Sequence, residues 1–164
     1  MPSSKNSPVV VVEQLIRAPR AAVFAAFVKP KKLKKFWLSK ASAPLEQGKT
    51  VEWHFKVRGV KDEVKVLALE PDRRIQVQWS DRSTTEWLFT SLNRKRTLVR
   101  VQQTGFSGKG AALIVEAADA AQGFAYVLSD LKILLERGIK SGIVKDKAAA
   151  IERELRRKKR SESR

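Results

Sequence analysis

The sequence predicts an α+β fold in which an antiparallel sheet packs against one long C-terminal helix. Two observations carry this prediction. Between residues 51 and 104, apolar side chains recur at every second position in consecutive segments joined by short polar turns, which is typical of an antiparallel meander with one wet face. Residues 117–138 instead carry an apolar stripe at helical spacing. Such a stripe must be buried against another element, and the apolar face of the meander is the available surface.

The first predicted element is a strand, and a helix follows it. Residues 9–16, VVVVEQLI, form a short run rich in β-branched side chains, as strands often do. Pro19 suits the first position of a helix, and apolar residues recur at helical spacing behind it. We therefore expect a helix over residues 19–28.

A second short helix is predicted within KPKKLKKFWLSK, residues 29–40. Pro30 suits its first turn. Leu33, Phe36 and Trp37 then share one face, and lysines occupy most of the other positions. The two rings are therefore expected to close the core or a cavity, while the lysines form the wet side and their long stems shield the rings. Two roles stay open for Trp37, a packing residue or a gate.

The central strands are predicted from alternation. In TVEWHFKV, Trp53 and Phe55 share one face, and His54 lies on the other, where we expect it to face solvent. Polar segments such as PDRR and NRKR separate the strands as turns. The predicted strands cover residues 50–57, 62–70, 74–80, 84–92 and 97–104.

The C-terminal part is predicted to contain a connection and one long helix. Residues 105–116, GFSGKGAALIVE, are expected to be a glycine-bearing connection. The long helix follows over residues 117–138, with Gly138 as its stop signal.

One folded domain is predicted, over residues 9–144, as the length of 164 residues favours. Residues 1–8 are polar and expected to be disordered. Residues 145–164 are expected to form a basic tail that is partly helical or disordered, because apolar residues are sparse there and the end is highly charged.

The composition restricts the partners and the compartment. A net charge of +17 and a pI near 10.5 favour anionic partners such as nucleic acid, acidic lipid or acidic proteins. The absence of cysteine excludes disulfides and thiolate chemistry and fits a reducing compartment. No apolar run is long enough to predict a transmembrane helix, and the N-terminal apolar run is too short for a secretory signal. We therefore expect a cytoplasmic protein.

No catalytic or metal-binding constellation is visible in the sequence. His54 is the only histidine, whereas a catalytic triad needs a buried, oriented histidine and a zinc site needs several nitrogen or sulfur ligands. Glu52 and Glu86 alternate out of phase with the aromatic residues, so both are expected to face water, and Asp130 could border a cavity. The glycines of residues 105–110 lack the GK[ST] signature of a phosphate loop. We expect no metal, no cofactor and no assigned catalytic residue.

Several segments resemble the START-like superfamily, also called SRPBCC or birch-pollen-allergen-like. They are APRAAVFAAF, LKKFWLSKASAPLEQG, LALEPDRRIQVQW, TLVRVQQTGF and QGFAYVLSDLKILLERGI, and their order spans residues 9–144. Within the superfamily the chain is most similar to bacterial homologues of the heat-shock-protein-90 ATPase activator, which are often labelled polyketide cyclases. The resemblance implies a helix-grip fold: a curved antiparallel sheet wraps the long C-terminal helix, and the two short helices close one end. It also implies a cavity between sheet and helix.

Inward-facing residues are the candidates to line such a cavity, and a packed core is the alternative role for each of them. Gln103 shares the inward face of its strand with Val101 and could orient a ligand. The predicted lining residues are Trp37, Trp53, Phe55, Trp79, Trp87, Phe89, Val101, Gln103, Phe106, Phe124 and Leu128.

The predicted function is binding of a small apolar, aromatic or lipid-like molecule, with no catalysis assigned. One alternative is a co-chaperone-like module that binds a heat-shock ATPase or another acidic protein. A further alternative is a cyclase-type enzyme, or nucleic-acid association through the tail, where phosphate binding would weaken steeply with salt. A merely solubilising tail is the other interpretation. The predicted anion-binding residues are Arg156, Arg157, Lys158, Lys159 and Arg160.

Overall fold

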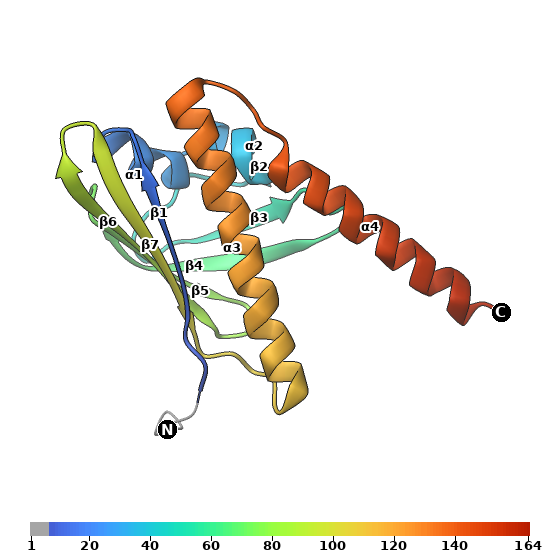
Figure 1. Ribbon diagram of the computed structural model, residues 1–164. Coiled ribbons are helices and arrows are strands. Elements are labelled where there is room, and N and C mark those ends of the chain that lie inside the picture. The colour runs from blue at the N-terminus through green and yellow to red at the C-terminus, as the bar shows by residue number, and fades with distance from the viewer. Residues whose placement is uncertain (1–6) are drawn as a thin grey trace.

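The computed structural model describes residues 7–164, so most of the predicted disordered segment 1–8 lies outside the described residues. Within the described part, seven strands form one curved antiparallel sheet and four helices accompany it (Figure 1). The strands are β1 (Val10–Ile16), β2 (Leu38–Ala41), β3 (Thr50–Phe55), β4 (Lys61–Glu70), β5 (Arg74–Trp79), β6 (Thr84–Asn93) and β7 (Arg96–Thr104). The helices are α1 (Arg20–Val28), α2 (Pro30–Phe36), α3 (Ala111–Arg137) and α4 (Ile143–Glu162).

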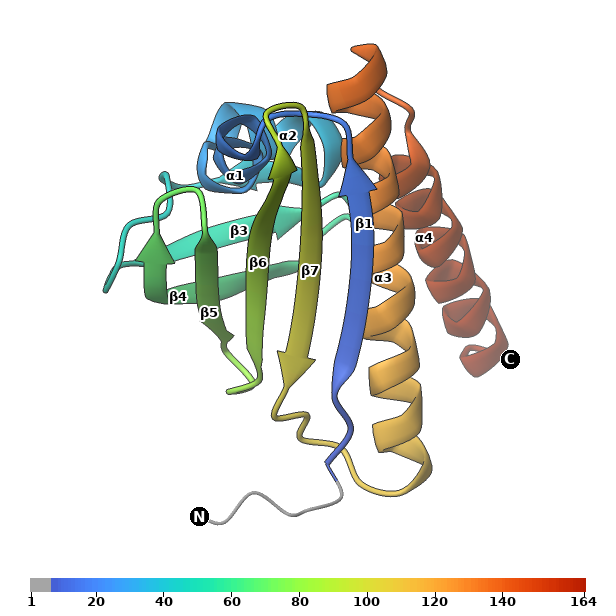
Figure 2. The same cartoon turned by 60° about the vertical axis from the view of Figure 1, so that its left-hand side comes forward.

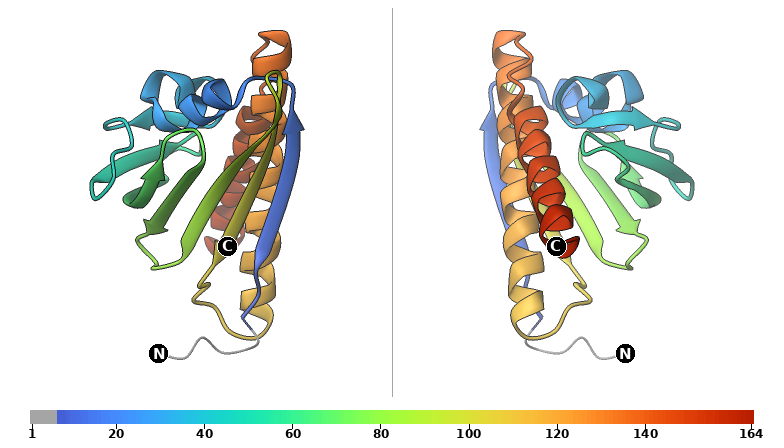
Figure 3. Two further views of the ribbon diagram at one scale, coloured as in Figure 1. Left: turned by 90° about the vertical axis from the view of Figure 1, so that its left-hand side faces the viewer. Right: turned by 90° about the vertical axis from the view of Figure 1, so that its right-hand side faces the viewer.

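The sheet has the strand order β1-β7-β6-β5-β4-β3-β2, so the first and last strands of the chain are neighbours. Strands β3 to β7 follow one another as an antiparallel meander, as the alternation predicts. Helix α3 runs along the inner face of the curved sheet, and α1 and α2 close one end (Figures 2 and 3). The predicted fold class, an α+β helix grip, is confirmed.

The core lies between the sheet and these helices, and aromatic rings fill much of it. Phe27 of α1 is 1% exposed, and its ring packs against those of Phe36, Trp87 and Phe89 at centroid distances of 5.5, 5.8 and 5.8 Å. The opposite face of the sheet is polar, where Arg74 Nε donates a 2.6 Å hydrogen bond to Glu86. The two faces therefore follow the predicted alternation.

The starts of two elements differ from those predicted. Strand β2 begins at Leu38, inside the segment assigned to the second helix, and its four residues are too few to show a period. Helix α3 begins at Ala111 rather than at residue 117. Its first turns lack an apolar stripe facing the core, because Ile114 and Val115 are 72% and 57% exposed. The spacing signal on which the prediction relied is therefore absent there.

The fourth helix follows a short turn that reverses the chain. Gly138 and Gly142 flank this turn, and both have the positive φ values, 69° and 77°, that favour glycine. Helix α4 then returns beside α3, and its C-terminal end diverges from the body of the domain (Figure 1). The segment predicted as a partly helical or disordered tail is a continuous helix from Ile143 to Glu162.

Among the described residues, α3 alone combines the length and mean hydropathy that a membrane span needs. Its stripe of Phe124, Val127, Leu128 and Leu131 packs in the core, and the core helix of a globular domain meets the same criterion. This packing accounts for the stripe, whereas Ile114 and Val115 near the start of α3 are apolar and exposed.

Candidate functional site

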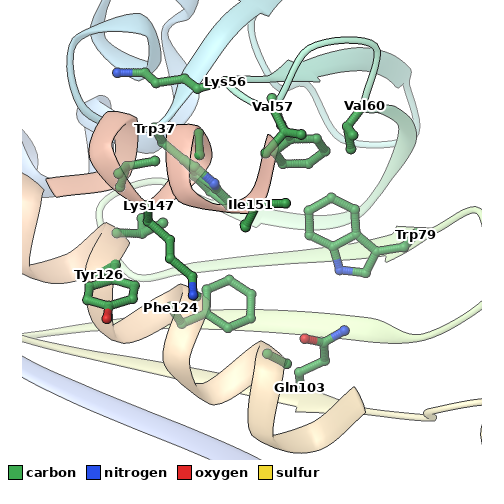
Figure 4. A pocket seen from close by; sticks show the side chains of 16 residues that line it. Trp37, Lys56, Val57, Val60, Trp79, Gln103, Phe124, Tyr126, Lys147 and Ile151 are labelled. Atoms are coloured by element: carbon green, nitrogen blue, oxygen red, sulfur yellow. The ribbon is translucent and has the colours of Figure 1, made fainter. Parts of the chain in front are cut away.

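A pocket of about 330 Å³ lies between the inner face of the sheet and helices α3 and α4 (Figure 4). One wall comes from the sheet side, including the end of α2 and the β3–β4 turn. The residues on this wall are Trp37, Phe55, Lys56, Val57, Val60, Trp79 and Gln103. The other wall comes from the two long helices, and its residues are Ala120, Gly123, Phe124, Tyr126, Val127, Val144, Lys147, Ala148 and Ile151.

Small side chains on the helices create the space of the pocket. Ala120 and Gly123 lie one turn apart on α3, and Ala148 lies on α4. They face large rings, with Phe55 and Trp79 on the sheet side. A large wall opposite small residues leaves a void that tight packing would otherwise fill.

Two polar groups of the wall are held in place by the sheet. The indole Nε1–H of Trp79 donates a 2.8 Å hydrogen bond to Thr85 Oγ1. The amide Nε2–H of Gln103 donates a 3.2 Å hydrogen bond to Ser83 Oγ. These bonds fix the two side chains, and the wall between them is apolar.

The structure places the predicted lining residues in two groups. Those on the pocket wall are Trp37, Phe55, Trp79, Gln103 and Phe124. Those buried in the packed core behind the wall are Trp53, Trp87, Phe89, Val101 and Leu128, each no more than 3% exposed. Phe106 is half-buried in the connection from β7 to α3, away from this wall. Alternation identifies the inward face of a strand but not the depth along that face, so core and wall residues share one pattern.

Of the two roles that the sequence left open for Trp37, the structure shows the packing role. It is 7% exposed and contacts five rings, with centroids 5.1 to 6.3 Å away, from Phe27, Trp53, Phe55, Trp87 and Phe124. Part of its surface also lines the pocket. Trp37 therefore joins the core to the wall, and a large movement of its ring would disturb both.

Comparison with known proteins identifies the family to which this fold and sequence belong. Residues 17–136 match the family model described as "Activator of Hsp90 ATPase homolog 1-like protein" (AHSA1). The chain belongs to the AHSA1-like family. The resemblance stated from the sequence is thereby confirmed, and no curated protein matches the sequence.

Solved structures of other proteins have the same fold. The crystal structure of protein SSP2350 from Staphylococcus saprophyticus is 26% identical, with a TM-score of 0.72 over 81% of this chain and 95% of that chain. The Aha1 dimer from Colwellia psychrerythraea is 20% identical, with a TM-score of 0.69 over 80% and 98% of the two chains. DynU16, a protein of the dynemicin biosynthetic locus, is 23% identical with a TM-score of 0.71, and the match covers 81% of this chain but about half, 49%, of that one.

Helix α4 lies outside the part of the chain that matches the AHSA1-like family model, which ends at residue 136. It nevertheless contributes Val144, Lys147, Ala148 and Ile151 to the pocket. Sequence reasoning missed this wall. The available signal was the spacing of apolar residues along 144–155, which is weak because charged residues separate them.

Two anchors hold α4 against the AHSA1-like domain. Asp130 of α3 is 1% exposed and accepts hydrogen bonds from Ser141 Oγ at 2.9 Å and from the Val144 backbone N–H at 3.1 Å. Near the middle of α4, Glu152 accepts a 2.6 Å hydrogen bond from the backbone N–H of Arg58 in the β3–β4 turn. Asp130 thus accepts a hydrogen bond from a backbone N–H that has no partner within α4, and it does not line the pocket.

The other carboxylates singled out by the sequence lie outside the pocket. His54 Nε2 is 2.5 Å from Glu52 Oε1, and this hydrogen bond, together with the charge of Lys61, lowers the pKa of Glu52. Glu86 pairs with Arg74 on the outer face. No group of three or more His, Asp or Glu side chains in residues 7–164 is placed to hold a metal ion.

The predicted anion-binding residues lie on the distal part of α4. All five, Arg156 to Arg160, are exposed, and Arg157 alone among them forms an ion pair with a described residue, Glu154, at 2.6 Å. They lie beyond Ile151, the last residue of α4 on the pocket wall. The structure therefore separates the basic end of the helix from the pocket.

Proposed function

We propose that this AHSA1-like chain binds a small apolar or aromatic molecule in the pocket between the sheet, α3 and α4. The observation that carries the proposal is the wall itself: the rings of Trp37, Phe55, Trp79, Phe124 and Tyr126 surround a space of about 330 Å³. Ligand sites are concave, mostly apolar and contain few polar groups, and this volume is near the lower end of their range. The ligand is therefore compact.

The proposal is that the chain binds a ligand, and no catalytic activity is assigned to it. The wall contains no histidine, carboxylate, serine or threonine, so the side chains used most often as bases and nucleophiles do not face the space. A cyclase-type activity stays an alternative in which pocket shape orients the substrate. The cysteine-free composition supports placing this binding protein in the cytoplasm.

Filling the pocket from Gly123 tests the proposal. A Cβ added at Gly123 meets no other atom within 4 Å, so Gly123→Leu extends into the pocket without a backbone clash. We expect the affinity for the fluorescent apolar probe N-phenyl-1-naphthylamine to fall about tenfold or more. Stability should stay unchanged or rise by up to about 1 kcal/mol, because leucine favours a helix interior more than glycine does. Fluorescence titration and thermal unfolding measure the two effects.

Gly123→Ala is the matched control, because it gains helix propensity and fills little of the pocket. It should keep probe affinity within about twofold. Equal probe binding by the wild type and Gly123→Leu would show that the probe binds elsewhere and would overturn the proposal. Native mass spectrometry of the freshly purified wild type would add the mass of any retained ligand.

A co-chaperone-like function is the second candidate, and the match to a family described as Hsp90 ATPase activator-like favours it. A protein partner would use the outer surface and the basic end of α4 rather than the pocket. Gly123→Leu separates the two functions. A heat-shock ATPase that binds the wild type and Gly123→Leu equally well would support the second candidate, whereas parallel loss of both binding activities would tie the partner to the pocket.

The basic end of α4 is expected to bind polyanions. Changing Arg156, Arg157, Lys158, Lys159 and Arg160 together to glutamine removes five exposed cations. We expect this variant to elute from heparin at lower salt than the wild type and to bind single-stranded DNA with a smaller dependence on salt, because fewer counterions are released. Unchanged elution would assign polyanion binding to the rest of the basic surface and would leave the tail a solubilising role.

A further inference from the structure

We propose that the molecule bound in this pocket carries an anionic group on its apolar body, and that Lys147 of α4 is the counter-ion. The inference rests on the proposed function and names the chemical class of its ligand: a compact aromatic or aliphatic carboxylate, sulfonate or phosphate ester.

The charges on the pocket wall are all of one sign. Lys56 and Lys147 both line the space, and no Asp or Glu does. Neither lysine has a carboxylate oxygen within 4 Å among the described residues, whereas the partly buried Lys132 and Arg74 each pair with a glutamate, at 2.7 and 2.6 Å. A cation beside an apolar wall lacks part of its hydration and is stabilised by an anion.

The ammonium of Lys147 turns inward, over α3. Its Nζ lies 5.9 Å from the centre of the Tyr126 ring, within the range of a cation–π interaction. Figure 4 shows the Lys147 side chain directed toward Tyr126 and Phe124. A half-buried lysine on a helix surface commonly extends its ammonium into water, so this inward orientation presents the charge to the pocket.

The second lysine shows that the rim of the pocket is electropositive. Burial lowers the pKa of Lys56, Asp130 raises it in part, and the charges of Lys145 and Lys140 lower it further. An anion bound at this end of the pocket would offset these like charges. In Figure 4 the ammonium of Lys56 points away from the aromatic rings, so we assign the direct contact to Lys147 and a supporting role to Lys56.

The experiment compares two probes with the same aromatic body. 8-Anilinonaphthalene-1-sulfonate carries one negative charge, and N-phenyl-1-naphthylamine is its uncharged parent. At roughly physiological ionic strength, we expect the wild type to bind the sulfonate about tenfold more tightly than the parent, as a charge-assisted contact in an apolar site would produce. Lys147→Met should remove most of this preference by lowering the affinity for the sulfonate more than the affinity for the parent, because methionine keeps the apolar stem but not the charge. Lys147→Arg should retain it.

Arg153→Met is the matched control for lost charge. Arg153 is exposed on α4, and it is neither on the pocket wall nor among the basic residues at the distal end. It should leave the preference for the sulfonate intact. Gly123→Leu should lower the affinity for both probes, which would assign their fluorescence signal to binding in the pocket.

The outcomes separate this inference from the proposed function. Equal affinity for the two probes in the wild type, or an undiminished preference in Lys147→Met, would overturn the inference while binding of the parent still supports the pocket. A sulfonate signal insensitive to Gly123→Leu would reflect the basic surface and would also overturn the inference. If neither probe binds in a manner that Gly123→Leu weakens, the proposed function itself is overturned.

Discussion

Replacing Phe27 with alanine is expected to lower the free energy of unfolding by about 3–5 kcal/mol, the range found for large aromatic truncations in cores. Phe27 is 1% exposed, and its ring touches rings from α2, β6 and the α2–β2 junction. The surrounding rings are large and come from separate elements, so they cannot collapse into the vacated volume without moving the ends of those elements. Chemical denaturation followed by tryptophan fluorescence and circular dichroism measures the loss.

Phe55→Ala is the informative comparison, because it removes the same side chain from the pocket wall. Phe55 is only partly buried and already borders the pocket, so its truncation enlarges an existing space instead of creating a new cavity. We expect a loss of about 1–3 kcal/mol, in line with the smaller apolar area involved, together with weaker binding of N-phenyl-1-naphthylamine. Phe27→Ala should instead act mainly on stability. Equal losses of stability in the two variants would contradict the division between core and wall.

The sequence pattern could not predict which inward-facing residues lie in the core and which lie on the pocket wall. Trp53 and Phe55 are two residues apart on β3 and share one face, so alternation predicts the same role for both. In the structure Trp53 is 0% exposed, whereas Phe55 borders the pocket. The ring of Trp37, from the end of α2, packs on Trp53 with centroids 5.1 Å apart, whereas Phe55 lies at the end of β3 beside the pocket. That is a property of tertiary packing, and no local pattern reports it.

The fold itself could be predicted because its signals are local and strong. The alternation of β3 to β7 and the stripe of α3 are each repeated over several turns or strands, and together they permit few architectures. The sequence signal for helix α4 is weak by comparison. Its few apolar residues contact the pocket, but their spacing is diluted by ten Lys/Arg and four Asp/Glu over residues 140–164. The sequence therefore indicated a solvated tail where the structure has a wall.

A buried carboxylate anchors the start of α4, and Asp130→Ala is expected to release this end of the helix. Asp130 accepts hydrogen bonds from Ser141 Oγ and the Val144 N–H, and Ser141 Oγ in turn accepts a 3.4 Å hydrogen bond from the Ile143 N–H. The carboxylate also lies at the positive end of the α4 dipole. We expect the free energy of unfolding to fall by about 2–3 kcal/mol, as for the loss of buried hydrogen bonds to a charged group.

The loss should extend to ligand binding, since Val144, Lys147 and Ala148 follow directly from this anchor and form part of the pocket wall. We expect the affinity for N-phenyl-1-naphthylamine to fall about tenfold, and hydrogen exchange to quicken in the first turns of α4 while the strands stay protected. Asp130→Asn keeps one acceptor oxygen and should lie between the wild type and Asp130→Ala. Asp146→Asn, at an exposed carboxylate in the first turn of α4, should change stability by about 0.5 kcal/mol or less. If Asp130→Ala left both exchange and probe affinity unchanged, Glu152 and the apolar contacts would suffice to hold α4, and the central role given to Asp130 would be wrong.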